Sequence, residues 1–230
     1  MNVPALHSRM SVDEAIVTRR SVRAFKPDPV SVETIKHILN VAARAPSGTN
    51  IQPWNVYVLT GAPKQNVTDA VLKRREEGPS DPEITYYPKK WREPYIGRRR
   101  KVGFDLYAIL GLGKEDKQGM WDYFARNYKF FGAPVGLFFT LDRDLELGSY
   151  MDLGMFLQSV MVAARGQGLD TCPQAAWIEY PKTVAQAIGI PDTEVLACGM
   201  SLGYEDKSDK INTLITVREP CEKFTKFVGF

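Results

Sequence analysis

The sequence is poor in the residues that several protein classes require. Its 230 residues include three cysteines, Cys172, Cys198 and Cys221, which are well separated, odd in number and without the spacing of a zinc or redox site. We therefore expect reduced thiols and a cytoplasmic location. No apolar run approaches the length of a membrane span. Residues 1–10 lack a basic region followed by an apolar run, so we expect a loose arm there and no signal peptide.

Histidine is scarce as well. The chain contains His7 and His37, and neither has a neighbouring motif that indicates a catalytic triad or a metal site. We therefore predict no metal and no catalytic side chain. A protein with little acid–base machinery can still catalyse redox chemistry if a cofactor carries it. The net charge of +3 is too small to indicate a nucleic-acid partner by itself.

The apolar pattern predicts helices and strands in a chain that is long enough for one domain with a sizeable core. Capping boxes at Ser11–Glu14 and Ser149–Asp152 predict the starts of two helices. The helix after Ser149 has the most regular apolar period, so we expect it to be central. The charged run 73–77 is expected to be a solvated face. Helices are predicted at 11–18, 31–45, 63–76, 149–166 and 181–188, and strands at 54–60, 133–141 and 194–204.

Three arginines and a serine lie within five residues directly after the first predicted helix: Arg19, Arg20, Ser21 and Arg23. A guanidinium fork matches phosphate oxygens bidentately and stays charged at every relevant pH. This arginine stretch can therefore hold a phosphate and the carbonyl groups of a flat ring. The alternative is that its cations complement the negative end of the helix, and composition alone leaves both interpretations open.

A second polar stretch, residues 45–54, joins the second predicted helix to the first strand. It contains small residues and two amides, Asn50 and Gln52. An amide offers both a donor and an acceptor, which suits the edge of a uracil-like ring. Taken alone, the stretch is equally typical of an ordinary helix-to-strand loop.

Together, the order and spacing of these two stretches resemble the flavin-binding signature of the FMN-dependent nitroreductase family. Later segments also resemble the family, in family order: 172–177 (Cys-Pro-Gln-Ala-Ala-Trp), 199–204 (Gly-Met-Ser-Leu-Gly-Tyr), Asn212 and 217–220 (Val-Arg-Glu-Pro). The resemblance covers about residues 11–230. It implies a single α+β domain over 1–230, with helices flanking a central, mostly antiparallel sheet. It also implies an intertwined homodimer, in which a tail at about 205–230 embraces the partner.

The resemblance further implies a tightly bound FMN at the subunit interface. The arginine stretch and Arg218 would hold the phosphate and the ring edge, and residues 46–52 would reach the flavin from the other subunit. Residues 173–175 would place backbone groups near the reactive edge of the ring. Several relatives have a glutamate and a glycine at the last two of these positions, so the group that contacts the flavin N5 stays open. The implied cofactor-binding residues are Arg19, Arg20, Ser21, Arg23, Pro46, Ser47, Asn50, Gln52, Pro173, Gln174, Ala175 and Arg218.

Residues 78–131 differ from the rest of the chain. Twelve of the 25 aromatic residues lie between Tyr86 and Phe131, together with a basic cluster at 89–101. Such a mixture can bind single-stranded nucleic acid, or it can be a surface helix whose aromatics face the core. We favour a helical lid that helps to form a substrate pocket, as an insertion at this place does in the family. The candidate pocket residues are Tyr86, Trp91, Tyr95, Arg99, Tyr107, Trp121, Phe124 and Tyr128.

The activity implied by the resemblance is NAD(P)H:nitroaromatic oxidoreduction. NAD(P)H would give a hydride to the flavin N5 and leave, and a nitroaromatic would then be reduced to a hydroxylamine in the same pocket, with ping-pong kinetics. The residue order of the lid resembles the subgroup that reduces nitrobenzene- or nitrobenzoate-like compounds. The alternatives are another flavin reductase of this fold, such as a reductive dehalogenase, and, remotely, a nucleic-acid-binding module.

Overall fold

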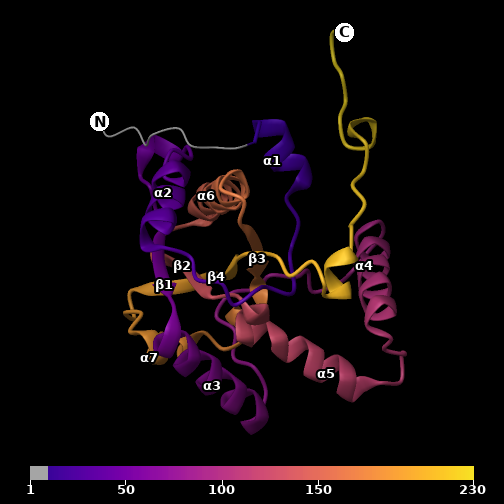
Figure 1. Ribbon diagram of the computed structural model, residues 1–230. Helices are drawn as coiled ribbons and strands as arrows, with labels where there is room; N and C mark the ends of the chain where they lie inside the picture. The colour runs from indigo at the N-terminus through magenta and orange to yellow at the C-terminus, as the bar shows by residue number, and fades with distance from the viewer. Residues whose placement is uncertain (1–9) are drawn as a thin grey trace.

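An antiparallel sheet of four strands forms the centre of the computed structural model, which describes residues 10–230 (Figure 1). Its strands are β1 (Asn55–Leu59), β2 (Val135–Asp142), β3 (Asp170–Gln174) and β4 (Glu194–Gly203). They lie in the order β1-β2-β4-β3, and every neighbouring pair is antiparallel. The predicted antiparallel sheet is therefore confirmed. The arm expected at residues 1–10, with His7, lies outside the described residues except for Met10.

Helices cover both faces of the sheet. On one face lie α2 (Val32–Ala42) and α6 (Leu147–Gly166), and on the other lie α3 (Gly61–Glu77) and α7 (Pro181–Ile188). Successive residues of the central strand β2 face opposite sides of the sheet. Because helices cover both sides, β2 is buried along its length up to Asp142. Phe138 packs in the core beneath α3 and α7, and Phe139 packs beneath α2 and α6. This double burial explains why the sequence of β2 is a continuous apolar run.

Of the serines at predicted helix starts, Ser11 and Ser31 cap their helices and Ser149 does not. Ser11 caps α1 (Val12–Thr18), where its hydroxyl accepts from the Glu14 amide, and Ser31 caps α2 in the same way. The capping box predicted at Ser149–Asp152 does not form, because α6 already begins at Leu147. Ser149 lies in the first turn, and the Asp152 carboxylate accepts a hydrogen bond from a distant loop instead.

The segment 78–131 contains α4 (Tyr95–Leu110), α5 (Lys117–Ala125) and most of a 3-10 helix, η2 (Arg126–Gly132). The solvated face expected at 73–77 is wrong for Arg75, which is 7% exposed. Its guanidinium carbon lies 3.3 Å from the centroid of the Trp121 ring on α5, which covers this turn of α3. None of the helices in the described part of the chain is long and apolar enough to cross a membrane.

Shorter 3-10 helices complete the chain, and one glycine permits close packing on the sheet. A β-carbon at Gly199 of β4 would lie 2.2 Å from Cδ1 of the buried Trp177, so this position admits only glycine without rearrangement. Figure 1 shows the tail leaving the body beside α4 and ending far from the sheet. The 3-10 helices besides η2 are η1 (Gly48–Asn50), η3 (Ala175–Glu179), η4 (Lys210–Thr213) and η5 (Cys221–Lys223).

Candidate active site

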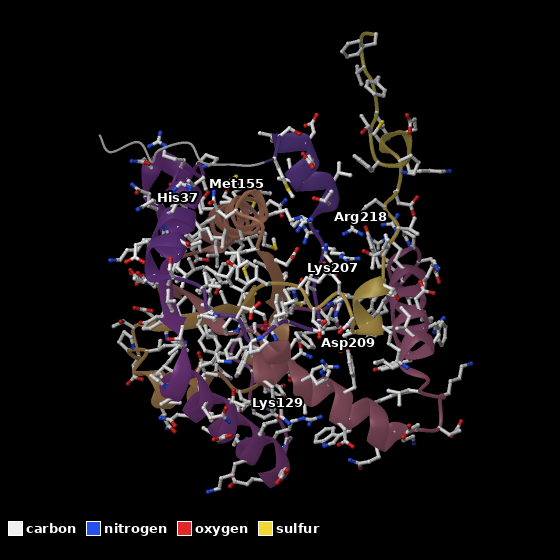
Figure 2. The ribbon with its side chains drawn as sticks, viewed as in Figure 1. His37, Lys129, Met155, Lys207, Asp209 and Arg218 are labelled. Atoms are coloured by element: carbon white, nitrogen blue, oxygen red, sulfur yellow. The ribbon has the colours of Figure 1, made fainter. Side chains whose placement is uncertain are left out.

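A cavity of about 850 Å³ lies where the arginine stretch faces the tail. Figure 2 shows Arg218 on the tail segment, near α1. We call this cavity the arginine cleft. Its lining residues come from the end of α1, the arginine stretch, α6 and the start of the tail: Ile16, Val17, Thr18, Arg19, Arg20, Ser21, Arg23, Gln158, Arg165, Glu205, Leu214, Ile215, Thr216 and Arg218.

The arginine stretch is held along the edge of the sheet. Ser21 forms a parallel bridge with Thr171 of the edge strand β3, and the Val22 amide donates to the Thr171 carbonyl at 3.1 Å. Successive residues of an extended segment face opposite sides. Val22 and Ala24 are accordingly buried in the protein, whereas Ser21 and Arg23 line the cleft.

A buried amide joins the tail to this stretch. The Asn212 side chain accepts from the Arg23 amide at 2.8 Å and donates to the carbonyls of Ala24 and Asp206, each at 2.9 Å. Asn212 thereby satisfies its oxygen and both amide hydrogens. Because η4 is fixed in this way, the tail leaves the sheet beside the arginines, and Arg218 comes to line the same cleft.

The cleft carries uncompensated positive charge. Arg19, Arg23 and Arg218 have no carboxylate within 4.0 Å among residues 10–230. Burial, and next the positive charge of Arg218, lower the pKa of Arg19. Arg23 and Arg218 each donate from one terminal nitrogen to nearby oxygens of their own segment, which leaves their other N–H groups for a ligand. An anion between the guanidinium groups would remove the repulsion and accept from these N–H groups. The donor set therefore fits a phosphate group.

Two acidic residues beside the cleft were not predicted from the sequence. Glu205 lines the cleft and pairs with Arg20, while Asp170 pairs with Arg165 at 3.1 Å. Burial raises the pKa of Asp170, and the Arg165 charge opposes that shift. These contacts join residues up to 185 positions apart, as in Arg20 and Glu205. The signal that points to Glu205 is its position just after β4, the strand that pairs with β3.

The second predicted stretch lies elsewhere. Pro46, Ser47, Asn50 and Gln52 do not line the arginine cleft of their own chain. Pro46 instead lines another cavity, of about 520 Å³, between α1, α2 and α6. We call this cavity the interhelical groove.

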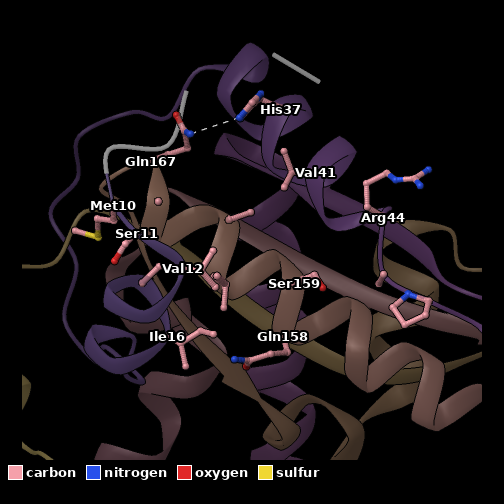
Figure 3. A pocket seen from close by; sticks show the side chains of 16 residues that line it. Met10, Ser11, Val12, Ile16, His37, Val41, Arg44, Gln158, Ser159 and Gln167 are labelled. Carbon is pink, nitrogen blue, oxygen red and sulfur yellow. Dashed lines mark hydrogen bonds between the residues drawn. The ribbon is translucent and has the colours of Figure 1, made fainter. Parts of the chain in front are cut away.

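The interhelical groove is largely apolar. In Figure 3, Val12 and Ile16 of α1 and Val41 of α2 line it beside Gln158 of α6. At one end a hydrogen bond of 3.4 Å joins His37 and Gln167. An apolar groove bounded by three helices is a surface that a further apolar segment can cover.

Comparison with known proteins identifies the family. The profile of the nitroreductase family matches residues 16–204. The 4-nitrobenzoate reductase of Pseudomonas putida is 39% identical over 218 residues, which are 95% of this chain and 96% of that protein. The chloronitrobenzene nitroreductase of Comamonas testosteroni is 41% identical over 219 residues, 94% of this chain and 96% of that protein. The chain belongs to the nitroreductase family.

Solved nitroreductases share its fold. The FMN and NADPH-dependent nitroreductase NfnB from sphigopyxis sp. strain HMH has a TM-score of 0.94 at 39% identity, over 96% of this chain and 100% of that one. The FMN-dependent NfnB from Mycobacterium smegmatis, solved in complex with NADPH, has a TM-score of 0.90 at 30% identity, over 94% and 97%. The predicted nitroreductase-like fold is therefore confirmed.

In this nitroreductase, the side chain of Gln174 points away from the arginine cleft. It is 2% exposed, donates to the Asn127 carbonyl at 2.6 Å and accepts from the Ser201 hydroxyl at 2.9 Å. The Gln174 side chain is thus occupied by contacts within the protein. Pro173 and Ala175 on either side are partly exposed.

The predicted pocket residues form separate groups, and none of them lines the arginine cleft. Around Trp91, the Arg99 guanidinium lies 4.7 Å from the indole centroid, and Tyr86 stacks edge-on against the adjoining Tyr87. The ring centroid of Tyr95 lies 5.0 Å from the guanidinium carbon of Arg92. Tyr107, Trp121, Phe124 and Tyr128 line a cavity of about 590 Å³ beside Arg75.

Tyr128 is a residue of the core. It is 1% exposed, its hydroxyl donates to the Ala176 carbonyl at 3.2 Å, and its ring packs against Trp177. An aromatic side chain that packs inward leaves the same sequence pattern as one that faces a ligand, so the sequence alone does not distinguish the two.

Proposed function

We propose that this nitroreductase is an FMN-dependent NAD(P)H:nitroaromatic oxidoreductase. The observation that carries the proposal is the arginine cleft, where three guanidinium groups without carboxylate partners surround a cavity in a chain of this family. The nitrobenzoate, chloronitrobenzene and nitrobenzene reductases that it resembles support flat nitroaromatics as the acceptor class. We propose a hydroxylamine as the product and the cytoplasm as the location.

In this mechanism, the residues of the chain would bind the FMN and orient it. Arg19 and Arg218 would hold the FMN phosphate, and Arg20, Ser21 and Arg23 would donate to the ring edge. Pro173, Gln174 and Ala175 would offer backbone groups from the edge strand β3. Bound FMN would supply a reversible two-electron carrier between NAD(P)H and the nitro group. Glu205 holds the Arg20 side chain at the cleft wall and limits its rearrangement.

We propose that the active form is a homodimer. Leu147, Met151 and Met155 recur at every fourth residue of α6 and form one ridge, on which Leu147 is 75% and Met151 65% exposed. A long central helix with an exposed apolar ridge is typical of an interface between copies. The interhelical groove continues from this surface through Gln158 and Ser159, and the tail carries exposed phenylalanines, among them Phe224. We assign the groove to the tail of a second copy.

In that dimer, Pro46, Ser47, Asn50 and Gln52 would reach the flavin of the other subunit. Their position outside the arginine cleft of their own chain supports this arrangement. Replacing Met151 with Arg should dissociate the dimer and release FMN together, which sedimentation and absorbance at flavin wavelengths would measure. Phe104→Arg changes another exposed apolar residue, on α4, and serves as the control. A monomeric Met151→Arg variant with full flavin would contradict the shared site.

Substrate selection would lie at the start of the lid. The Arg98–Glu219 ion pair of 3.2 Å joins α4 to the tail, and α4 and the tail enclose a cavity of about 780 Å³ that includes Arg218. The lid thus adjoins the arginine cleft. We propose Tyr86, Trp91, Tyr95 and Arg99 as residues that contact the substrate. Tyr107, Trp121 and Phe124 would shape the pocket from farther away, since they surround Arg75.

The experiment that tests the function is an anaerobic titration followed by absorbance. The purified protein should be yellow or take up added FMN, lose its colour with NADH or NADPH, and recover it with a nitrobenzoate. A protein that neither holds nor takes up FMN would overturn the proposal. Halide release from an iodinated phenol without nitroaromatic turnover would favour the dehalogenase alternative instead.

A further inference from the structure

The loop that carries Asn50 and Gln52 has an unusual backbone. Thr49, Asn50 and Gln52 have φ angles of 49°, 63° and 49°. Residues other than glycine seldom adopt this left-handed region, and each instance costs of order 1–3 kcal/mol unless the surroundings enforce it. Three instances within four residues therefore require contacts that hold the loop in place.

Most side-chain hydrogen bonds of this loop are internal. The Gln52 amide donates to the Ser47 hydroxyl at 3.0 Å, and the Gln52 side chain donates to the Asn50 carbonyl at 3.0 Å. Internal bonds can shape the loop, but they cannot fix its position on the protein. The exception is Gly48, whose amide donates to Asp152 of α6 at 3.3 Å to Oδ1 and 3.2 Å to Oδ2.

The helix α6 also holds the far end of the loop. Trp54 stacks on Phe156, with ring centroids 4.5 Å apart and an interplanar angle of 5°. Asp152 and Phe156 are four residues apart, so they lie on one face of the helix. One helix face thus fixes the loop at two points, by a carboxylate at Gly48 and by an aromatic stack at Trp54.

A buried aspartate such as Asp152 costs more free energy than an apolar side chain packed at the same place. It is 7% exposed, and no cation lies within 4.0 Å of it among residues 10–230. A buried carboxylate needs hydrogen bonds to offset its lost hydration. The hydrogen-bond donor that the structure gives it is the Gly48 amide. An apolar side chain would pack at this position at less cost if the loop needed no anchor.

We propose that Asp152 is a positioning residue for the flavin site. Its carboxylate fixes the Gly48 amide and thereby sets the strained turn that presents Asn50 and Gln52 to the flavin of the partner subunit. The inference rests on the function proposed above. Asp152 touches the loop and not the ligand, so its effect must pass through the loop.

Two pairs of variants test this role. Asp152→Leu removes the acceptor, while Asp152→Asn keeps an oxygen that can accept from the Gly48 amide. Gly48→Pro removes the donor with the carboxylate intact, and the extended backbone of Ser47, with ψ of 153°, suits a following proline. Gly48→Ala is the matched control, because its β-carbon would lie 3.9 Å from Asp152 Oδ2, an ordinary contact.

The readouts are the dissociation constant for FMN and the visible circular dichroism of the bound flavin, which reports the surroundings of the ring. Losing a hydrogen bond to a charged group should weaken FMN binding at least about tenfold in Asp152→Leu relative to Asp152→Asn. Gly48→Pro should show the same loss relative to Gly48→Ala, with the same altered dichroism. The double variant Asp152→Leu/Gly48→Pro should bind no worse than either single variant, because both changes break one contact.

A purely structural role predicts a different result. Melting temperatures would then fall while the flavin dichroism and the dissociation constant stayed at wild-type values, and that outcome would overturn the inference. Should Asp152→Leu fail to fold, the Gly48 pair gives the same comparison without touching α6. A wild-type protein that binds no FMN would refute the proposed function itself, whereas wild-type FMN binding with unaffected variants would refute only the role of Asp152.

Discussion

Replacing Arg19 with alanine should separate ligand binding from stability in this protein. Arg19 lines the arginine cleft without a carboxylate partner, and burial and the charge of Arg218 lower its pKa. The guanidinium is therefore unfavourable in the empty cleft and favourable once an anion binds. The opposite signs expected for affinity and stability form a demanding test.

The magnitude follows from the contacts that a phosphate would make. Losing a hydrogen bond to a charged group costs about 1.5–3 kcal/mol, which is a roughly 10- to 150-fold weaker affinity for FMN. Riboflavin, which lacks the phosphate, should bind nearly as well to the variant as to the wild type. Without flavin, removing the repulsion should stabilise the variant by up to about 1 kcal/mol, a rise of up to about 2–4 °C in melting temperature.

The assay is a fluorescence titration of the flavin-free protein with FMN and with riboflavin, together with thermal unfolding without ligand. Arg100→Ala, an exposed arginine on α4 that does not line the cleft, is the matched control. Arg19→Lys keeps the charge but not the fork, so its FMN affinity should lie between those of the alanine variant and the wild type. Equal losses of FMN and riboflavin affinity would refute the phosphate assignment. A clearly lower melting temperature of flavin-free Arg19→Ala would refute the predicted relief of repulsion.

Further predictions concern the core and the thiols. Arg75→Ala should lose its interaction with the Trp121 ring, about 2 kcal/mol, and lower the melting temperature by about 4–8 °C without changing FMN affinity; an unchanged thermal scan would contradict it. Gly199→Ala should destabilise by about 1–3 kcal/mol because its β-carbon would meet Trp177, and denaturant melts followed by tryptophan fluorescence would reveal wild-type stability if this is wrong. At pH 8, alkylation mapped by mass spectrometry should label the exposed Cys221 first. Burial raises the pKa of Cys172 to about 11 and that of Cys198 to about 12. Both thiols therefore stay protonated, and unreactive, until the pH rises through those values.

Sequence patterns predicted well wherever the deciding contact is local. The predicted helices 11–18 and 31–45 begin where a serine hydroxyl accepts from an amide three residues on, at Ser11 and Ser31, and both of these caps formed. The same rule failed at Ser149, because Asp152 is bound to the Gly48 amide, which is 104 residues distant. The prediction that Arg75 is solvated was wrong for a related reason. Its position in a charged run does not indicate that α5 covers it.

By itself, the sequence determined the family, the strands β1, β2 and β4 and the arginine stretch, because residue order, apolar period and motif spacing are properties of the chain. The edge strand β3 was not predicted and appeared only in the tertiary structure. Only the tertiary structure decided that Glu205 holds Arg20, that the Gln174 side chain belongs to the core, and that residues 46–52 lie away from the arginine cleft of their own chain. The physical reason is that these contacts join segments brought together by packing on the two faces and the edge of the sheet. The sequence determines which side chains are charged or can form hydrogen bonds, and the fold determines which groups these side chains contact.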